Sequence, residues 1–276
     1  MTTSLACSGC EGGELESQTI VVSFEGPVAR VTLNRPEVHN AFNSEMFQDL
    51  DRAFDEIGER EDTRVVVLTG EGKSFCAGAD LNWMKRVKEM TFEESVQDSL
   101  VLSELLYKMY SFPRPTIARV NGAAIGGGTG FVCVCDIAVA SDKAKFSFSE
   151  VKLGLVPACI SPYAVRRIGE SRARRFFLSG ERLSAELARE AGLVNFVVKH
   201  DELDDFINGL IEQIVTSGPC ALSACKRLIE GVSSMTLNSA KRFTAEVLAE
   251  LRKGEEGQEG MAAFLEKRKP DWLEEK

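Results

Sequence analysis

The sequence predicts an α/β fold, because segments with strand character alternate with segments of helical periodicity along most of its length. The strand-like segments are short apolar runs rich in β-branched residues, and short loops separate them from the helical ones. Such an alternation is typical of a sheet whose strands are connected by right-handed helical crossovers. Beyond about residue 200 the pattern is helical only, which predicts a helical region at the C-terminal end.

The first expected elements are a hairpin and an amphipathic helix. Residues 19–24 and 28–33 have strand character, and a Glu-Gly-Pro turn at residues 25–27 separates them. Residues 44–58 show helical periodicity, with one apolar face made of Met46, Phe47, Leu50, Phe54 and Ile57. Residues 64–69 contain the apolar run Val65-Val66-Val67-Leu68 and are followed by Gly70, which predicts a buried strand.

The same alternation continues through the rest of the chain. Further strands are expected at residues 115–120, 136–140 and 192–198. The expected helices are 92–110, one that begins near Gly128, 161–168, 172–178, 184–191, 202–217, 220–231 and 236–253. We therefore divide the chain into a disordered tail (residues 1–17), a core domain (18–200) and a helical C-terminal region (201–276).

The composition is that of an ordinary globular protein, since 44% of the 276 residues are hydrophobic and 27% are charged. No apolar run reaches the roughly 18 residues that suggest a membrane span. The first 13 residues have neither the basic region nor the apolar core of a signal peptide. The net charge of -9, with no basic stripe, argues against nucleic acid as a partner. We therefore predict a cytoplasmic protein that binds neither membrane nor nucleic acid.

The eight cysteines could indicate a metal site. Cys7 and Cys10 have a spacing that metal sites use, but no second pair of cysteine or histidine residues follows at a suitable distance. Cys133, Cys135 and Cys159 lie in apolar segments, where cysteine behaves as a small hydrophobic residue. We therefore predict reduced thiols and no metal ion.

A triple glycine, Gly126-Gly127-Gly128, precedes a carboxylate, Glu150, by about twenty residues. Glycine lets backbone amides approach a ligand with no Cβ in the way, and such amides can stabilise an oxyanion. Glu150 has apolar neighbours, which predicts partial desolvation, a raised pKa and a capacity for proton transfer. Each feature taken alone also has a structural explanation, since glycines permit tight packing and a glutamate at a strand end is usually exposed.

Three motifs resemble those of the crotonase family, the enoyl-CoA hydratases and isomerases. They are residues 33–41 (LNRPEVHNA), 73–81 (KSFCAGADL) and 121–128 (NGAAIGGG), and the resemblance extends in order from Val21 to Trp272. It implies a spiral of repeated ββα turns followed by a C-terminal helical region that supports trimerisation. Homotrimers, or dimers of trimers, are therefore expected.

The resemblance also implies a chemistry and a set of site residues. The substrate would be an acyl-CoA thioester, and no cofactor is expected because CoA is part of the substrate. Glu150 would transfer the proton, and the amides of Ala79 and Gly127 would hold the thioester oxygen in an enolate-like state. Asp80 would cap its own loop. The residues implied in substrate or CoA binding are Val38, Ala41, Ala77, Ala79, Asp80, Leu81, Gly126, Gly127, Gly130 and Pro157.

The sequence departs from the family pattern at one position. Two-glutamate hydratases carry their other carboxylate two residues past the triple glycine, where this chain has Gly130. Residues 149–163 are similar to a subgroup with glycine at that place, which looks like bacterial methylglutaconyl-CoA and carboxygeranoyl-CoA hydratases. We therefore predict an enoyl-CoA hydratase that adds water to an α,β-unsaturated thioester, such as methylglutaconyl-CoA.

Other functions fit the same residues less well. A Δ3,Δ2-enoyl-CoA isomerase would use Glu150 as its single proton shuttle, and an acyl-CoA hydrolase would direct water at the thioester. One crotonase-like hydratase is associated with RNA binding, which the acidic net charge disfavours here. The acyl group would depend on the pocket around Trp83, Met84, Val156, Ile160 and Tyr163.

Overall fold

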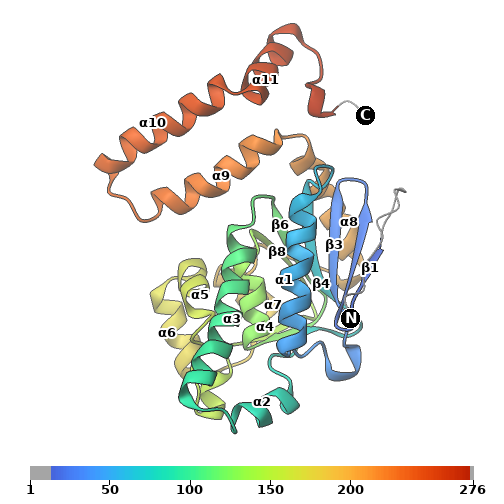
Figure 1. Cartoon of the computed structure of the whole chain (residues 1–276), viewed down its shortest axis with the longest axis vertical. Coiled ribbons are helices and arrows are strands. Elements are labelled where there is room, and N and C mark those ends of the chain that lie inside the picture. The colour runs from blue at the N-terminus through green and yellow to red at the C-terminus, as the bar shows by residue number, and fades with distance from the viewer. Residues whose placement is uncertain (1–13, 274–276) are drawn as a thin grey trace.

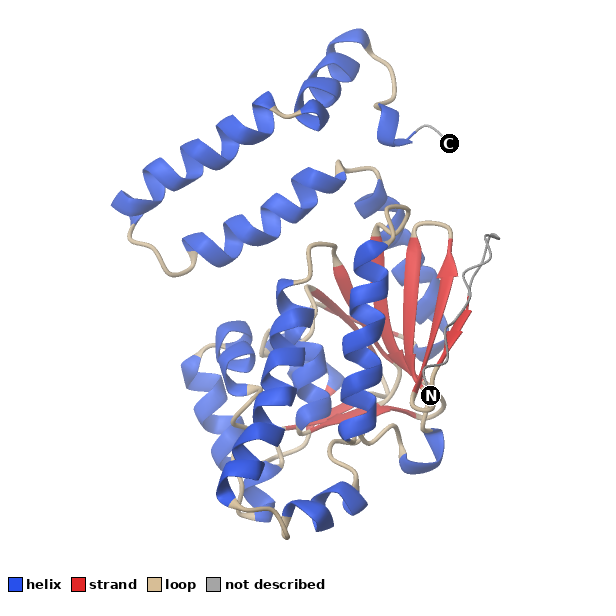
Figure 2. Ribbon diagram, in the orientation of Figure 1, coloured by secondary structure: helices blue, strands red, loops and turns tan. Residues whose placement is uncertain are grey.

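The computed structural model describes residues 14–273 of the chain. It combines two β-sheets of unequal size with helices that pack on them, and a set of C-terminal helices extends beyond the sheets (Figure 1). Figure 2 shows the larger sheet standing upright and the smaller sheet lying across its lower end. This confirms the predicted α/β class with C-terminal helices.

The larger sheet has seven strands in the order β1-β2-β3-β4-β6-β8-β11. The pairs β1–β2 and β2–β3 are antiparallel, and all later neighbours are parallel. The strands are β1 (Glu14–Glu16), β2 (Ile20–Glu25), β3 (Val28–Leu33), β4 (Val65–Gly70), β6 (Thr116–Val120), β8 (Ile137–Ser141) and β11 (Phe196–Val198). The predicted hairpin and the four later strand segments are therefore all present, whereas β1 falls inside the predicted tail.

The smaller sheet has four strands in the order β10-β9-β7-β5. They are β5 (Ser74–Cys76), β7 (Ala123–Ile125), β9 (Lys145–Ser147) and β10 (Leu183–Ser184). Strands β5, β7 and β9 follow β4, β6 and β8 of the larger sheet after short loops. Each such pair precedes helical structure, which is the repeated ββα turn that the resemblance implies. Strands of two or three residues are too short to show a periodicity in the sequence.

The helices of the core fill the space beside the two sheets. Helix α1 (Ser44–Glu59) buries all five residues of its predicted apolar face. The other core helices are α2 (Leu81–Val87), α3 (Phe92–Ser111), α4 (Gly127–Val134), α5 (Ser161–Ile168), α6 (Glu170–Ser179) and α7 (Ala185–Glu190). Of these, only α2 was not expected, because a helix of seven residues is too short to give a clear helical pattern.

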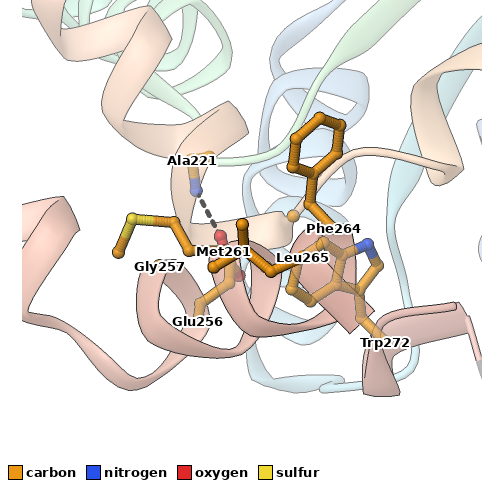
Figure 3. A pocket seen from close by; sticks show the side chains of 9 residues that line it. Ala221, Glu256, Gly257, Met261, Phe264, Leu265 and Trp272 are labelled. Atoms are coloured by element: carbon orange, nitrogen blue, oxygen red, sulfur yellow. Dashed lines mark hydrogen bonds between the residues drawn. The ribbon is translucent and has the colours of Figure 1, made fainter. Parts of the chain in front are cut away.

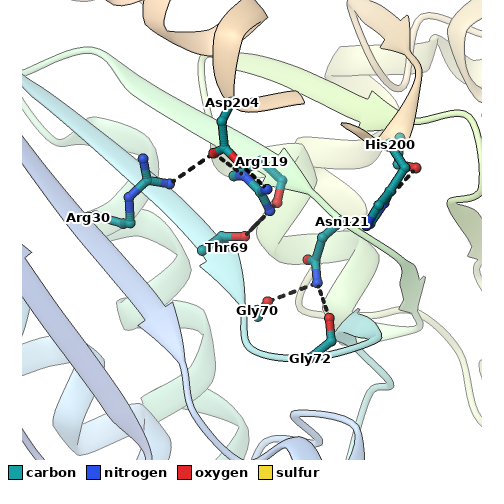
Figure 4. Close-up of polar contacts among 9 residues, drawn as sticks. Arg30, Thr69, Gly70, Gly72, Arg119, Asn121, His200 and Asp204 are labelled. Atoms are coloured by element: carbon teal, nitrogen blue, oxygen red, sulfur yellow. Dashed lines mark hydrogen bonds and ion pairs between the residues drawn. The ribbon is translucent and has the colours of Figure 1, made fainter. Parts of the chain in front are cut away.

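Helix α8 (Leu203–Val215) covers the other face of the larger sheet. Its buried residues Leu203, Ile207 and Ile211 form a second core with Val65, Val67, Ile117 and Val139. Asp204 reinforces this contact, since Arg119 donates to it at 2.8 and 2.7 Å and Arg30 lies 3.7 Å away (Figure 4). The core therefore continues to α8, beyond the predicted boundary at residue 201, because β4 is buried on both faces.

The C-terminal helices are α9 (Pro219–Val232), α10 (Leu237–Lys253) and α11 (Glu255–Glu266). Helix α10 has no buried residue. Lys226 of α9 connects these helices to the core, since its Nζ donates a hydrogen bond to Oδ2 of Asp136 at 2.7 Å. An open apolar groove of about 540 Å³ lies between α9 and α11, and Met261, Phe264, Leu265 and Trp272 line it together with Ala221 (Figure 3). Glu256 accepts hydrogen bonds from the amides of Cys220 and Ala221 at the start of α9.

Residues 1–13, with Cys7 and Cys10 and most of the predicted tail, lie outside the described residues. The six cysteines between residues 14 and 273 are free thiols. In the same part of the chain, no helix has the length and apolar character needed to cross a bilayer. Nor does a cluster of three metal-binding side chains occur among residues 14–273.

Candidate active site

The site lies where three parallel strands of the smaller sheet end side by side. Strand β7 pairs in parallel with β5 on one side and with β9 on the other. The carboxyl ends of parallel strands meet at one edge of a sheet, which is a common position for ligand sites. The segments that follow β5, β7 and β9 carry Ala79, Gly127 and Glu150, so the topology brings the three predicted catalytic positions together.

Ala79 is held by a short parallel bridge to Phe42. The amide of Phe42 donates to the carbonyl of Gly78 at 2.8 Å, and the amide of Asp80 donates to the carbonyl of Phe42 at 2.9 Å. In this pairing the amide of Ala79 faces the opposite side, and it has no acceptor among residues 14–273. Gly78 has a φ of +95° and lies against the carbonyl of Ile125, a conformation that favours glycine.

Gly127 is the first residue of α4. The first amides of a helix have no intrahelical acceptor, and the amide of Gly127 finds none elsewhere in residues 14–273. The helix dipole adds a partial positive charge at this end. A Cβ on Gly127 would lie 2.5 Å from the ring of Phe42, the residue that also holds Ala79. Phe42 therefore connects the two free N–H groups, which form a candidate oxyanion hole.

The carboxylate of Glu150 lies beside Gly126, the residue that precedes Gly127. Glu150 begins a short 3-10 helix (Glu150–Leu153), and its Oε1 would be 3.2 Å from a Cβ on Gly126. Its Oε2 is buried and has no hydrogen-bond partner among the described residues. Burial raises the pKa of Glu150 above its ordinary value. A desolvated carboxylate of this kind is a suitable general base.

Asp80 has the capping role that the sequence predicts. Its Oδ1 accepts hydrogen bonds from the amides of Asn82 and Trp83 at the start of α2, and its Oδ2 accepts one from Arg35 at 2.9 Å. Burial alone would raise the pKa of Asp80, but these hydrogen bonds outweigh it and hold the pKa below its ordinary value. Asp80 therefore stays ionised and orients its loop. Arg35 also donates to the carbonyl of Ala41, so it links Asp80 to the loop that follows β3.

The structure brings most of the other predicted binding residues to this edge. The amide of Ala77 donates to the carbonyl of His39 at 3.0 Å, so the loop with Val38 and Ala41 runs beside the loop with Ala77 and Ala79. Leu81 is 74% exposed at the start of α2. Gly126, Gly127 and Gly130 belong to the first turn of α4 and the residue before it, and Pro157 is buried in the loop between Glu150 and α5. Their contact with CoA stays a prediction.

The space next to Gly130 is occupied by Ile160, the residue immediately before α5. A Cβ on Gly130 would lie 2.2 Å from Cγ2 of Ile160, whose side chain is 2% exposed. Ile160 therefore fills the space that a side chain at position 130 would need. The sequence gave no signal for this contact between segments thirty residues apart. Nor did the sequence indicate that Phe42 would pair with Ala79 and lie against Gly127.

The comparisons with known proteins agree with this geometry. The model of the enoyl-CoA hydratase/isomerase family matches residues 23–275. An enoyl-CoA hydratase structure from Shewanella pealeana is 38% identical with a TM-score of 0.90, covering 92% of this chain and 96% of that one. The short-chain-enoyl-CoA hydratase of Clostridium acetobutylicum is 34% identical over 92% of this chain and 97% of its own length. The 2,3-dehydroadipyl-CoA hydratase of Escherichia coli is 32% identical over 92% and 98%.

The chain belongs to the enoyl-CoA hydratase/isomerase family. This confirms the predicted family and, with it, the predicted class of enzyme, the enoyl-CoA hydratases.

Replacing Gly127 tests the oxyanion donor. Gly127→Pro removes the N–H, and proline is tolerated at the first position of a helix, so kcat should fall by about 10²–10³ while KM changes little. Gly127→Ala is the matched control, because it places a Cβ against Phe42 equally but keeps the N–H. Circular dichroism checks the folding of both variants. Equal kcat in the two variants would mean that the Gly127 amide is not a donor.

Replacing Gly130 with glutamate tests the closed position. Gly130→Glu must displace Ile160, so we expect no gain in crotonyl-CoA hydration and a loss of about 1–3 kcal/mol in the free energy of unfolding. Adding Ile160→Ala should restore part of that stability, and Ile160→Ala alone is the control. Denaturant unfolding and a hydration assay measure both effects. A tenfold gain in the single variant would contradict this view of the site.

Proposed function

We propose that this enzyme hydrates a branched or carboxylated enoyl-CoA and that Glu150 is its only proton-transfer group. One observation carries the proposal: a desolvated carboxylate with an unpaired oxygen lies beside Gly126, at the edge of the smaller sheet that also carries two amides without an acceptor among residues 14–273. A carboxylate and an oxyanion hole are the groups that enolate chemistry on a thioester requires.

The reaction can be balanced with these groups alone. Glu150 accepts a proton from water as the water oxygen bonds to the β-carbon. The electron pair of the double bond moves toward the thioester, and the amides of Ala79 and Gly127 stabilise the negative charge on its oxygen. Glu150 then returns the proton to the α-carbon. One water is added on one face of the substrate, and the carboxylate is regenerated without a cofactor.

The proposed kind of acyl group rests on the glycine at position 130 and on similarity to hydratases that act on such substrates. The subgroup that residues 149–163 resemble acts on branched or carboxylated acyl groups. The Escherichia coli relative is named for 2,3-dehydroadipyl-CoA, which carries a second carboxyl group. A screen of linear, branched and carboxylated enoyl-CoAs tests this choice. Equal turnover of all three kinds would contradict it.

A Δ3,Δ2-enoyl-CoA isomerase is the second candidate. The observation that favours it is the single carboxylate, since one base suffices to carry a proton between the α- and γ-carbons. Parallel assays with 2-enoyl-, 3-enoyl- and saturated acyl-CoA separate hydratase, isomerase and hydrolase. A salt-dependent filter-binding assay tests RNA binding, which the net charge of -9 disfavours. The cytoplasmic location stays a prediction.

Glu150→Gln keeps the size of the side chain but removes the base. We expect kcat to fall by at least about 100-fold on a confirmed substrate, with KM little changed. The variant should also lose the exchange of α-hydrogens of a saturated acyl-CoA with deuterated water. Glu190→Gln, at an exposed position of α7, is the control. Turnover like that of the wild type would remove Glu150 from the mechanism.

The same variant gives a prediction for pH dependence. Because burial raises the pKa of Glu150 above 4.5, the acid limb of kcat/KM should lie above pH 4.5. A raised pKa in the folded state means that stability is lost as the pH rises through that pKa. Glu150→Gln should therefore have a higher Tm than the wild type at pH 7–8, and the difference should vanish near pH 4. A lower Tm at pH 7–8 would contradict the burial of an unpaired charge.

We propose a homotrimer or a dimer of trimers as the assembly. Apolar side chains are exposed on the C-terminal helices, including Leu237 at 91%, Phe264 at 82% and Leu265 at 79%. Light scattering should give three or six times the mass of the chain. Phe264→Asp with Leu265→Asp should lower that mass, whereas Leu178→Asp on α6, equally exposed, should not. A monomer at micromolar concentration would exclude the assembly.

A further inference from the structure

Trp83 contains a buried donor that has no partner. Its Nε1 is among four buried side-chain atoms without a hydrogen bond in residues 14–273, together with Arg64 Nε, Asn121 Oδ1 and Glu150 Oε2. Arg64 and Asn121 are bonded through other atoms, since Arg64 Nη2 donates to the carbonyl of Ser217 and Asn121 Nδ2 to that of Gly70. An indole has only one polar atom, so Trp83 makes no side-chain hydrogen bond with the described residues.

An unpaired buried indole N–H is unusual, because buried tryptophan usually finds an acceptor. The other tryptophan of the chain, the half-buried Trp272, does have an acceptor, since it donates to the carbonyl of Thr216 at 3.1 Å. Of the four unpaired atoms, Glu150 Oε2 belongs to the group that must meet a substrate. Trp83 Nε1 therefore needs an explanation of the same kind, a group that arrives with the ligand.

The position of Trp83 supports this explanation. It is the third residue of α2, four residues past Ala79, and its amide is held by Asp80 Oδ1. The indole packs edge-on to Phe42, with ring centroids 6.0 Å apart, and Phe42 lies against Gly127. The ring of Phe42 thus contacts both the indole of Trp83 and the position of Gly127, so Trp83 lies one aromatic ring away from the candidate oxyanion hole.

The charge of α2 indicates the kind of group. The helix has no acidic residue and carries Lys85 and Arg86 in its last turn. The ionised N-cap Asp80 is paired with Arg35. The two cations and an N–H without an acceptor among residues 14–273 therefore favour an anionic acceptor. A carboxylate on the acyl chain has that chemistry, whereas an alkyl chain would leave the N–H unpaired.

We propose that Trp83 selects carboxylated substrates, with its Nε1–H donating a hydrogen bond to the carboxylate of the acyl group. This inference rests on the proposed hydratase function and names the residue that reads the acyl chain. A site built to pair a polar group discriminates strongly against an analogue that lacks it. Trp83 is thus a specificity residue and does not take part in proton transfer.

The test compares two substrates of equal chain length, 2,3-dehydroadipyl-CoA and trans-2-hexenoyl-CoA. Trp83→Phe keeps an aromatic ring and removes the N–H. We expect kcat/KM to fall about tenfold or more for the carboxylated substrate and to stay within about twofold for the other. Trp272→Phe is the matched control and should leave the ratio of the two unchanged. An equal fall for both substrates, or no fall for either, would overturn the inference.

A second measurement leaves Trp83 intact, which covers the case in which Trp83→Phe does not fold. The chain has two tryptophans, so in Trp272→Phe the only indole fluorescence comes from Trp83. Saturating adipyl-CoA should shift this emission, whereas hexanoyl-CoA should shift it less. Identical spectra would contradict the hydrogen bond. If hexenoyl-CoA is hydrated and Glu150→Gln abolishes this while both Trp83 tests fail, only the inference about Trp83 is lost.

Discussion

The site depends on the close parallel pairing of β5, β7 and β9. This pairing leaves no room for side chains at two glycines: a Cβ on Gly128 would lie 2.2 Å from the carbonyl of Cys76, and one on Gly122 would lie 2.0 Å from that of Lys73. A larger residue at either position would push the neighbouring turns of the spiral apart. Since Ala79, Gly127 and Glu150 come directly after the three strands, their mutual placement follows from this contact.

The site is built with polar groups that lack partners, which has a cost in stability. The amides of Ala79 and Gly127, Oε2 of Glu150 and Nε1 of Trp83 have no acceptor or donor among residues 14–273. Elsewhere in the same loops polar groups are fully used, as in the contacts of Asp80 with Arg35 and two amides. The contrast separates the groups that hold the loops in place from the unpaired groups to which we assign a substrate, because a buried polar group without a partner calls for an explanation.

Sequence patterns predicted the long elements well and the short ones poorly. Helix α1 and strand β4 were found because an apolar face or an apolar run extends over a dozen or half a dozen residues. The strands of the smaller sheet have two or three residues, so only the family resemblance implied them. Gly130 was recognised as a departure and Ile160 was named as a pocket residue, but their contact could not be predicted, since no local pattern connects positions 130 and 160.

The sequence by itself determined the fold class and, through its resemblance to a known family, the choice of Glu150 as the candidate carboxylate, because periodicity and motifs are local properties of the chain. The tertiary structure alone decided that Phe42 links the two amides, that Ile160 closes position 130 and that α8 belongs to the core. It also decided that Trp83 has a buried N–H without an acceptor in residues 14–273. Burial and hydrogen bonding depend on which distant segments meet, and that is fixed only when the whole core packs.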